Sequence, residues 1–81
     1  MAKPSPTYSG APVLKALGLT IRKSRVQLGL AQETLALETE LDRSYLGGIE
    51  RGEHNLALIN LLKIAKALKT SPSALLNEAG Y

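Results

Sequence analysis

The chain has 81 residues, a formal net charge of +3 and a hydrophobic content of 44%. It contains no cysteine, which excludes a disulfide framework and a thiolate metal site, and no Phe or Trp, so Leu, Ile, Val and Ala must form the core. One small domain of packed helices is therefore expected. No apolar run approaches the ~20 residues that cross a bilayer and no signal-peptide pattern is present, so we expect a soluble, cytoplasmic protein without a membrane partner.

The first segment, residues 1–12, holds three of the four prolines, a composition typical of a flexible or extended arm. It is either a frayed terminus or an arm in which Tyr8 packs on the domain or a partner and Lys3 contacts a phosphate. We expect residues 13–78 to form the folded domain and residues 79–81 to form a short C-terminal tail.

A first helix is predicted from about Pro12 or Val13 to Leu28, because proline is tolerated in a first turn and apolar residues recur at helical spacing. Gly18 costs this helix ~1 kcal/mol relative to alanine, and a close helix crossing is the expected reason. Gly29 is expected to end the helix in the left-handed conformation. The inward stripe is expected to consist of Leu14, Leu17, Ile21 and Leu28.

Two short helices joined by a tight turn follow, over about residues 32–38 and 42–51. Ala31 precedes the first helix and has no side-chain oxygen to cap it, whereas Asp42 is a good N-cap for the second. The turn contains Glu40, which either adopts a positive φ at a cost or gives the turn another shape. The inward residues are expected to be Leu35 and Ala36 in the first helix and Tyr45, Leu46 and Ile49 in the second.

Two adjacent glycines, Gly47 and Gly48, lie within the second of these helices. They cost ~2 kcal/mol in helix propensity relative to two alanines. Either the backbone closely approaches a groove wall or a neighbouring helix at this point, or the helix is held by tertiary contacts and tolerates a defect. In both cases the side chains of this helix that can contact a binding partner are confined largely to its first turn.

The remaining sequence predicts two more helices, from about Leu58 to Lys69 and from about Pro72 to Asn77. Ser71 followed by proline is a strong helix start. The inner face of the first is expected to consist of Leu58, Leu61, Leu62, Ala65 and Leu68. Its outer, solvated face is expected to carry Lys63, Lys66 and Lys69.

The segment from Gln32 to Gly52 resembles the helix-turn-helix of lambda-repressor-like proteins, the xenobiotic-response-element (XRE) type. The resemblance extends from about Leu14 to Leu76. It implies an all-α, five-helix domain that binds double-stranded DNA. The matching residues are Leu17-Gly18, Ile21-Arg22, Arg25, Gly29, Gln32, Leu35-Ala36, Glu50-Arg51-Gly52, Asn55, Leu58, Leu61-Leu62, Ile64-Ala65 and Ala67-Leu68. The stretch from Leu41 to Tyr45 is similar to the recognition helix of restriction-modification controller proteins.

A DNA-reading role assigns base contacts to the exposed first turn of the helix over 42–51. Arg43 can donate a bidentate pair to guanine, and Ser44 and Gly47 lie on the same side. Arg43 could instead be a solvated arginine or a phosphate contact. Asp42 could accept from a cytosine amino group, although its capping role is favoured.

Phosphate contacts are assigned partly by the resemblance. It implies that Gln32 contacts a phosphate at a helix start and that Arg51 and Asn55 flank the DNA backbone. The Tyr45 hydroxyl can donate a hydrogen bond to the DNA backbone while its ring packs against the protein. The only histidine, His54, has no metal-binding partners and is expected to be exposed or to face a phosphate.

The resemblance also implies a structural salt bridge between Arg25 and Glu50, which would attach the helix-turn-helix to the first helix. Between residues 32 and 53 there are six acidic residues and two arginines, so a DNA-contacting segment must keep most of its acids off the contact face.

We expect a sequence-specific, repressor-like transcriptional regulator, acting as a homodimer on a pseudo-palindromic operator. Candidates for the dimer interface are Ile59, Leu75, Leu76 and Tyr81. The alternative is a protein-interaction module or antitoxin-like partner protein that uses the same bundle. The residue types support no catalytic constellation, cofactor, metal or small-molecule effector.

Overall fold

A computed structural model describes residues 8–81, and it contains helices and no strands over this range. The first twenty residues of the described fold form a turn and then α1, Pro12–Gln27, which begins at the first of the two predicted starts. Gly29 follows with φ of 71°, the left-handed conformation predicted for it. The tail of the predicted arm, from Tyr8 onward, is part of the fold, because Gly10 N donates to Gly52 O at 2.8 Å. The predicted contact of Lys3 lies outside the described residues.

Four further helices complete the predicted set of five, and their bounds agree with the sequence analysis to within two residues. They are α2, Gln32–Thr39; α3, Arg43–Glu50; α4, Leu58–Ala67; and α5, Pro72–Glu78. None of the helices in the described range is long and apolar enough to cross a membrane.

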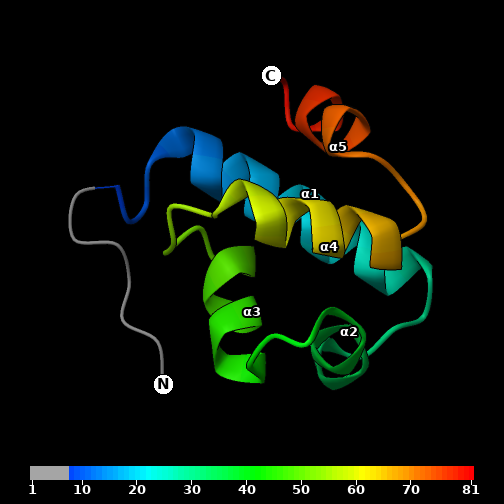
Figure 1. Ribbon diagram of the computed structural model, residues 1–81. Coiled ribbons are helices and arrows are strands. Elements are labelled where there is room, and N and C mark those ends of the chain that lie inside the picture. Colours follow the sequence, from blue (N-terminus) through cyan, green and yellow to red (C-terminus); the bar gives the residue numbers. More distant parts are fainter. Residues whose placement is uncertain (1–7) are drawn as a thin grey trace.

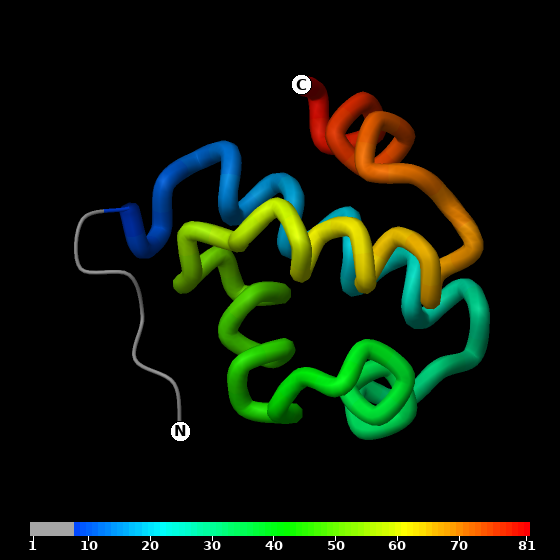
Figure 2. The backbone as a smooth tube through the Cα atoms, viewed as in Figure 1, coloured from blue at the N-terminus to red at the C-terminus, as the bar shows by residue number. Residues whose placement is uncertain are grey.

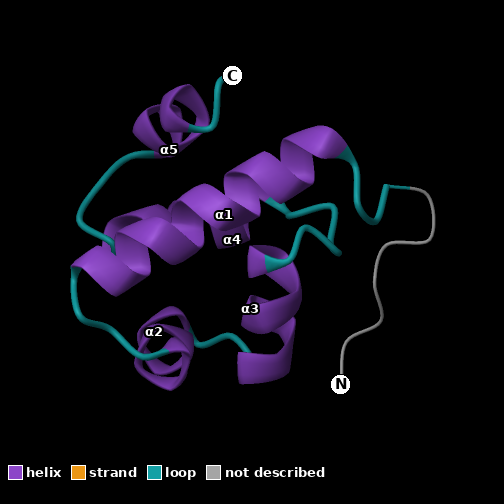
Figure 3. Ribbon diagram, turned by 180° about the vertical axis from the view of Figure 1, so that it is seen from behind, coloured by secondary structure: helices purple, strands orange, loops and turns teal. Residues whose placement is uncertain are grey.

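The helices pack in layers around α1 and α4 (Figure 1). α2 and α3 lie together at one side of this central pair and α5 lies at the other, and the view from behind shows the same arrangement with α1 in front (Figure 3). α1 contacts α3 and α5, whereas α4 contacts α2 and α5. The helix-turn-helix is therefore supported from behind by both central helices.

The core is aliphatic, as the composition requires, and five of its side chains are almost fully buried. The prediction of Leu35, Ala36, Leu46 and Ile49 as inward residues is confirmed. The five most deeply buried large side chains are Ile21, Leu35, Leu46, Ile64 and Leu75.

Three leucines predicted to be inward are instead exposed. Leu58 is 66% exposed and Leu62 46%, because α4 turns Leu61, Ile64 and Ala65 toward the core. Leu28 is 42% exposed because it follows the end of α1. The prediction is confirmed for Leu61, Ala65 and Leu68, which are buried, and it was wrong for Leu58 and Leu62.

Gly18 marks a close crossing of α1 and α3. A Cβ placed on Gly18 would overlap the carbonyl oxygen of Ile49 and would lie 2.7 Å from that of Glu50. The predicted reason for this glycine is therefore confirmed. Without a side chain at Gly18, the C-terminal end of α3 rests directly on α1.

A short turn connects α2 and α3, and the chain can be followed through it in Figure 2. One residue of this turn is strained. Glu40 has φ of 57° and ψ of 32°, which is the left-handed conformation that costs residues with a Cβ ~1 kcal/mol or more. Leu41 N donates to Ala36 O at 3.0 Å and closes the end of α2. The first of the two alternatives for Glu40 is confirmed, and the turn keeps the shape that a glycine would give it.

Replacing Ala31 by serine is expected to raise the free energy of unfolding by ~1 kcal/mol. Ala31 occupies the N-cap of α2 with an extended backbone, but it gives no side-chain cap. Urea denaturation of both proteins measures the change. At the N-cap of α5, Ser71 Oγ already accepts from Ala74 N at 3.1 Å, so Ser71→Ala is the reciprocal control with an expected loss of similar size. No gain in Ala31→Ser would contradict the expectation.

Candidate nucleic-acid interface

α3 is fixed by a cap at its start and by core packing along its inner face. Asp42 Oδ2 accepts a hydrogen bond from Tyr45 N at 3.2 Å, which confirms the predicted N-cap. Leu46 is fully buried and Ile49 is 3% exposed. The first turn of α3 can therefore project from the molecule while the rest of the helix is immobilised.

The residues expected to contact bases differ in accessibility. Arg43 is exposed, Ser44 is half-buried and Gly47 is buried. A Cβ on Gly47 would lie 3.1 Å from Arg51 Nη1 and 3.6 Å from Gln32 Oε1. Gly47 is thus covered by the ends of two flexible side chains, and Arg43 is the most accessible of the three.

A network of side chains ties α3 to α1 and α2. Arg25 Nε donates to Glu50 Oε2 at 2.7 Å and Arg25 Nη2 donates to Glu50 Oε1 at 3.1 Å, so the predicted salt bridge is present and bidentate. Arg25 Nη1 also donates to Leu30 O at 2.8 Å. Gln32 Nε2 donates to Glu50 Oε1 at 2.9 Å. The Glu50 side chain is 2% exposed, and this carboxylate is therefore held by two partners inside the fold.

Arg51, at the end of α3, forms an exposed pair with Glu53. Arg51 Nε donates to Glu53 Oε2 at 2.7 Å and Arg51 Nη2 donates to Glu53 Oε1 at 3.3 Å. The hydrogen bond from Arg51 lowers the pKa of Glu53, and the same bond raises the pKa of Arg51. The pairing of Glu53 with Arg51 was not predicted from the sequence, and the spacing of two residues between the opposite charges is the signal that could have indicated it.

Tyr45 is half-buried, and its hydroxyl accepts a hydrogen bond from Asn60 Nδ2 at 3.1 Å. Its ring packs against the core, as expected. Asn55 is exposed in the loop after α3, beside a hollow of about 230 Å³ that Tyr8 and Leu14 also line. Both residues lie near α3, and their phosphate contacts stay predictions.

The expectation that His54 is exposed or faces a phosphate is wrong. His54 is 6% exposed, and its ring lies against the ring of Tyr45. Its burial depends on Gly48, which leaves room for the imidazole. No local pattern around residue 54 indicates this contact.

Half of the acidic residues between positions 32 and 53 are engaged within the fold. Asp42 caps α3, Glu50 is buried against Arg25, and Glu53 pairs with Arg51. Asp42 Oδ2 and both carboxylate oxygens of Glu50 and of Glu53 accept hydrogen bonds from the protein. This arrangement reduces the repulsion that an anionic backbone would otherwise meet at α3.

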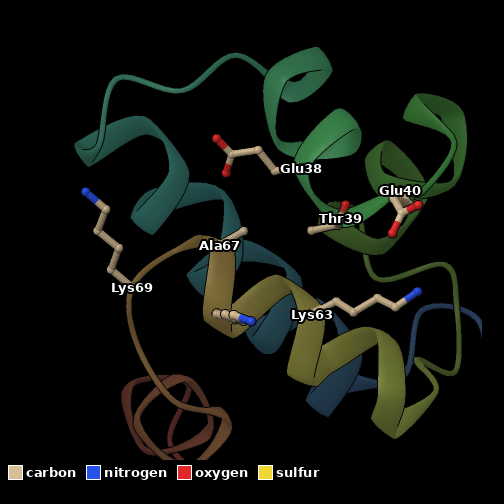
Figure 4. Close-up of a pocket in the computed structure, with 7 residues that line it drawn as sticks. Glu38, Thr39, Glu40, Lys63, Ala67 and Lys69 are labelled. Atoms are coloured by element: carbon tan, nitrogen blue, oxygen red, sulfur yellow. The ribbon is translucent and has the colours of Figure 1, made fainter.

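A hollow of about 440 Å³ lies between the end of α2 and α4, and Arg43 does not line it (Figure 4). Its lining mixes the acids Glu38 and Glu40 with Lys63 and Lys66 of α4 and with Lys69, which follows α4. Figure 4 shows Glu38 and Glu40 on one wall and Lys63 and Lys69 on the other. The Thr39 hydroxyl is occupied by α2 carbonyls, at 2.7 Å from Leu35 O. Among the described residues, no group of three acidic, histidine or cysteine side chains could hold a metal. The exposed residues of α3 are thus the better candidate site.

The sequence profile described as helix-turn-helix matches residues 21–75. The chain is 43% identical over 61 residues to control protein C.BamHI of Bacillus amyloliquefaciens, covering 74% of this chain and 75% of the relative. It is 40% identical over 68 residues to control protein C.SmaI of Serratia marcescens, covering 84% and 81% of the two chains.

The fold is also similar to a solved structure, that of the restriction-modification controller protein C.AhdI from Aeromonas hydrophila. The TM-score is 0.75 at 50% sequence identity, and the match covers 76% of this chain and 94% of that one. Both parts of the resemblance stated from the sequence, to XRE-type helix-turn-helix proteins and to controller proteins, are confirmed. The chain therefore belongs to the helix-turn-helix family of DNA-binding transcription regulators, which are not enzymes.

Proposed function

We propose that this regulator reads the major groove of its operator with α3, through the exposed first turn that carries Arg43. The observation that supports this most is the contrast within α3. Arg43 is exposed at the capped start of the helix, whereas Leu46 and Ile49 are buried behind it. A short helix with one accessible turn suits insertion into a groove about 12 Å wide.

Arg43 is the proposed reader of a guanine, because its guanidinium can donate to O6 and N7 together. Ser44 would contact a base or a phosphate from the same turn. A base contact from Gly47 would require the side chains of Gln32 and Arg51 to lie aside. Sequence choice is therefore assigned mainly to Arg43.

The phosphate contacts would surround this turn. Gln32 is at the start of α2, where the helix end favours an anion, and Arg51 is at the end of α3. Tyr45 and Asn55 would contribute a hydroxyl and an amide. In the free protein the side chains of Gln32 and Arg51 are bonded to Glu50 and Glu53, so DNA binding would exchange carboxylate partners for phosphates.

A homodimer on a pseudo-palindromic operator is part of the proposal, and the small size of the module supports it. One short helix contacts few base pairs, and pairing two half-sites about 34 Å apart multiplies specificity. Of the interface candidates, Ile59 and Tyr81 are 63% and 65% exposed, and Leu58 is 66% exposed on the same helix as Ile59. Leu75 is 1% exposed and belongs to the core, which removes it from the interface.

We propose further that the protein acts in the cytoplasm. The genes that it regulates are proposed to belong to a restriction-modification system. Support comes from the name of the C.AhdI structure, which describes a restriction-modification controller protein, and from the 50% identity of its sequence to this chain. The control proteins C.BamHI and C.SmaI extend this similarity.

Selection from random duplex DNA tests the proposal. The wild-type protein is expected to enrich a palindromic motif with half-sites about one helical turn apart, and its affinity is expected to fall as salt rises. Arg43→Ala is expected to lose ~1 to 3 kcal/mol of discrimination at one guanine in each half-site. Arg43→Lys is the matched control for charge, since lysine keeps the positive charge but lacks the planar fork of the guanidinium, and it is expected to keep part of this discrimination.

If Arg43→Ala keeps the motif unchanged and weakens binding to all duplexes alike, Arg43 contacts a phosphate and does not read a base. If the wild-type protein enriches no sequence at low or at high salt, the proposal of sequence-specific reading by α3 is wrong. A partner pull-down would then test the protein-interaction alternative.

Replacing Glu53 by glutamine is expected to increase affinity a few-fold for specific and non-specific duplexes alike. The change removes an anion near the phosphates and releases Arg51 from its carboxylate partner. Fluorescence anisotropy with an operator and a scrambled duplex measures it. Glu78→Gln on α5 controls for the change in net charge and is expected to have little effect at moderate salt. A weaker affinity in Glu53→Gln would mean that Glu53 orients Arg51 for binding.

A further inference from the structure

The single histidine of the chain lies directly behind the recognition helix α3. His54 is 6% exposed although it is in the loop after the helix. A Cβ placed on Gly48 would lie 2.5 Å from His54 Nε2 and 2.7 Å from Cδ2. The imidazole therefore rests on the backbone of α3, and only glycine at position 48 leaves space for it.

The same ring contacts Tyr45, one turn earlier on α3. The two ring centroids are 4.7 Å apart, with an angle of 52° between the planes. The Tyr45 hydroxyl in turn accepts from Asn60 Nδ2 at 3.1 Å, and Asn60 belongs to α4. A continuous set of contacts thus connects the loop, two positions of α3 and the supporting helix α4.

We propose that His54 is a positioning residue that fixes the direction in which α3 presents Arg43 and Ser44 to the groove. This inference rests on the proposed reading of DNA by α3. Gly48 is five residues from Arg43, or about 7.5 Å along the helix. A tilt of about 10° at Gly48 would displace the start of α3 by about 1 Å. Bidentate recognition tolerates errors of only about 0.5 Å, so such a tilt would affect base reading first.

Phosphate contacts should be less sensitive to the same tilt. Arg51 has a flexible side chain that is 61% exposed, so its guanidinium can move to keep contact with a phosphate when the helix tilts. Non-specific affinity depends on such charge contacts. A positioning role therefore predicts a loss in the ratio of specific to non-specific affinity, whereas a merely structural role predicts a loss of stability with an unchanged ratio in the folded protein.

The test compares His54→Ala with His54→Phe, which keeps a planar ring. Affinities for the selected operator and for a scrambled duplex are measured well below the melting temperature of each variant, with circular dichroism to establish that each is folded. His54→Ala is expected to lower the affinity ratio about tenfold, with non-specific affinity changed by less than about twofold. His54→Phe is expected to keep most of the ratio.

Several outcomes would overturn the proposal. An unchanged ratio in folded His54→Ala would assign the residue to stability alone. A parallel fall of both affinities, with a smaller salt slope, would make it a phosphate contact. If the wild-type protein prefers no operator, the proposed function fails, and the positioning role fails with it.

A second pair of variants addresses the contact with Gly48 itself. Gly48→Ala should displace the imidazole and lower the ratio of specific to non-specific affinity, the same effect that is expected for His54→Ala. In the double variant, which combines Gly48→Ala with His54→Ala, the new methyl group at position 48 enters the space that the imidazole ring has left. The double variant is therefore expected to lose less than the two single losses combined, and additive losses would contradict the contact as the cause.

Discussion

Replacing Arg25 by alanine is expected to lower the free energy of unfolding by ~3 kcal/mol and to weaken operator binding in parallel. Removing one partner of a buried ion pair leaves the other charge without compensation, which costs ~3 to 5 kcal/mol. Glu50 would be the stranded charge, with a side chain that is 2% exposed. The lower end of the range applies because Gln32 Nε2 still donates to Glu50. Urea denaturation and operator titration measure the two effects.

The control for Arg25→Ala is Arg22→Ala, one turn earlier on α1. Arg22 is exposed, so its removal is expected to change stability by no more than about 0.5 kcal/mol. Both variants lose one positive charge from the same helix, and the comparison isolates the buried pair. Equal stability of the two variants would remove the structural role of the salt bridge.

Replacing Gly18 by alanine is expected to destabilise the protein by ~3 kcal/mol, although alanine has the higher helix propensity. The added methyl group would overlap the carbonyl oxygen of Ile49 and lie 2.7 Å from that of Glu50. Backbone atoms cannot move aside as a side chain can, so α3 must separate from α1. The expected loss exceeds the ~1 kcal/mol gained from propensity. A lower urea midpoint and weaker operator binding should appear together.

Gly47→Ala is the matched control for Gly18→Ala. Its methyl group would meet the flexible ends of Arg51 and Gln32, with Arg51 Nη1 at 3.1 Å. These ends can shift, so the helix-propensity gain of ~1 kcal/mol should remain. The same substitution in two helices is therefore expected to have opposite signs. A stabilising Gly18→Ala would show that the crossing of α1 and α3 can relax without cost.

The five helices and their limits could be predicted because their signals are local. Pro12 and Pro72 begin helices, Gly29 ends one, and Asp42 caps α3 through its own side chain. Each of these effects acts over only a few residues. The charge pair of Arg25 with Glu50 is 25 residues apart, and it was predicted only through the family resemblance.

The errors concern contacts that local signals do not determine. α4 has apolar residues on most of its surface, so its period did not show whether Leu62 or Ile64 faces the core, and Ile64 is the fully buried one. The burial of His54 depends on Gly48 and Tyr45 of α3, which the loop sequence alone does not indicate. The Asn60 contact with Tyr45 joins α4 to α3 and was missed for the same reason.

The packing of Tyr45 also gives α3 a spectroscopic probe of its own. The chain has three tyrosines and no tryptophan. Tyr8 and Tyr81 are 56% and 65% exposed, whereas Tyr45 is half-buried against a second ring and hydrogen-bonded to Asn60. Near-ultraviolet circular dichroism arises from aromatic rings held in fixed surroundings. The near-ultraviolet spectrum of this protein should therefore report mainly on Tyr45, so a helix that is reoriented can be observed without an added label.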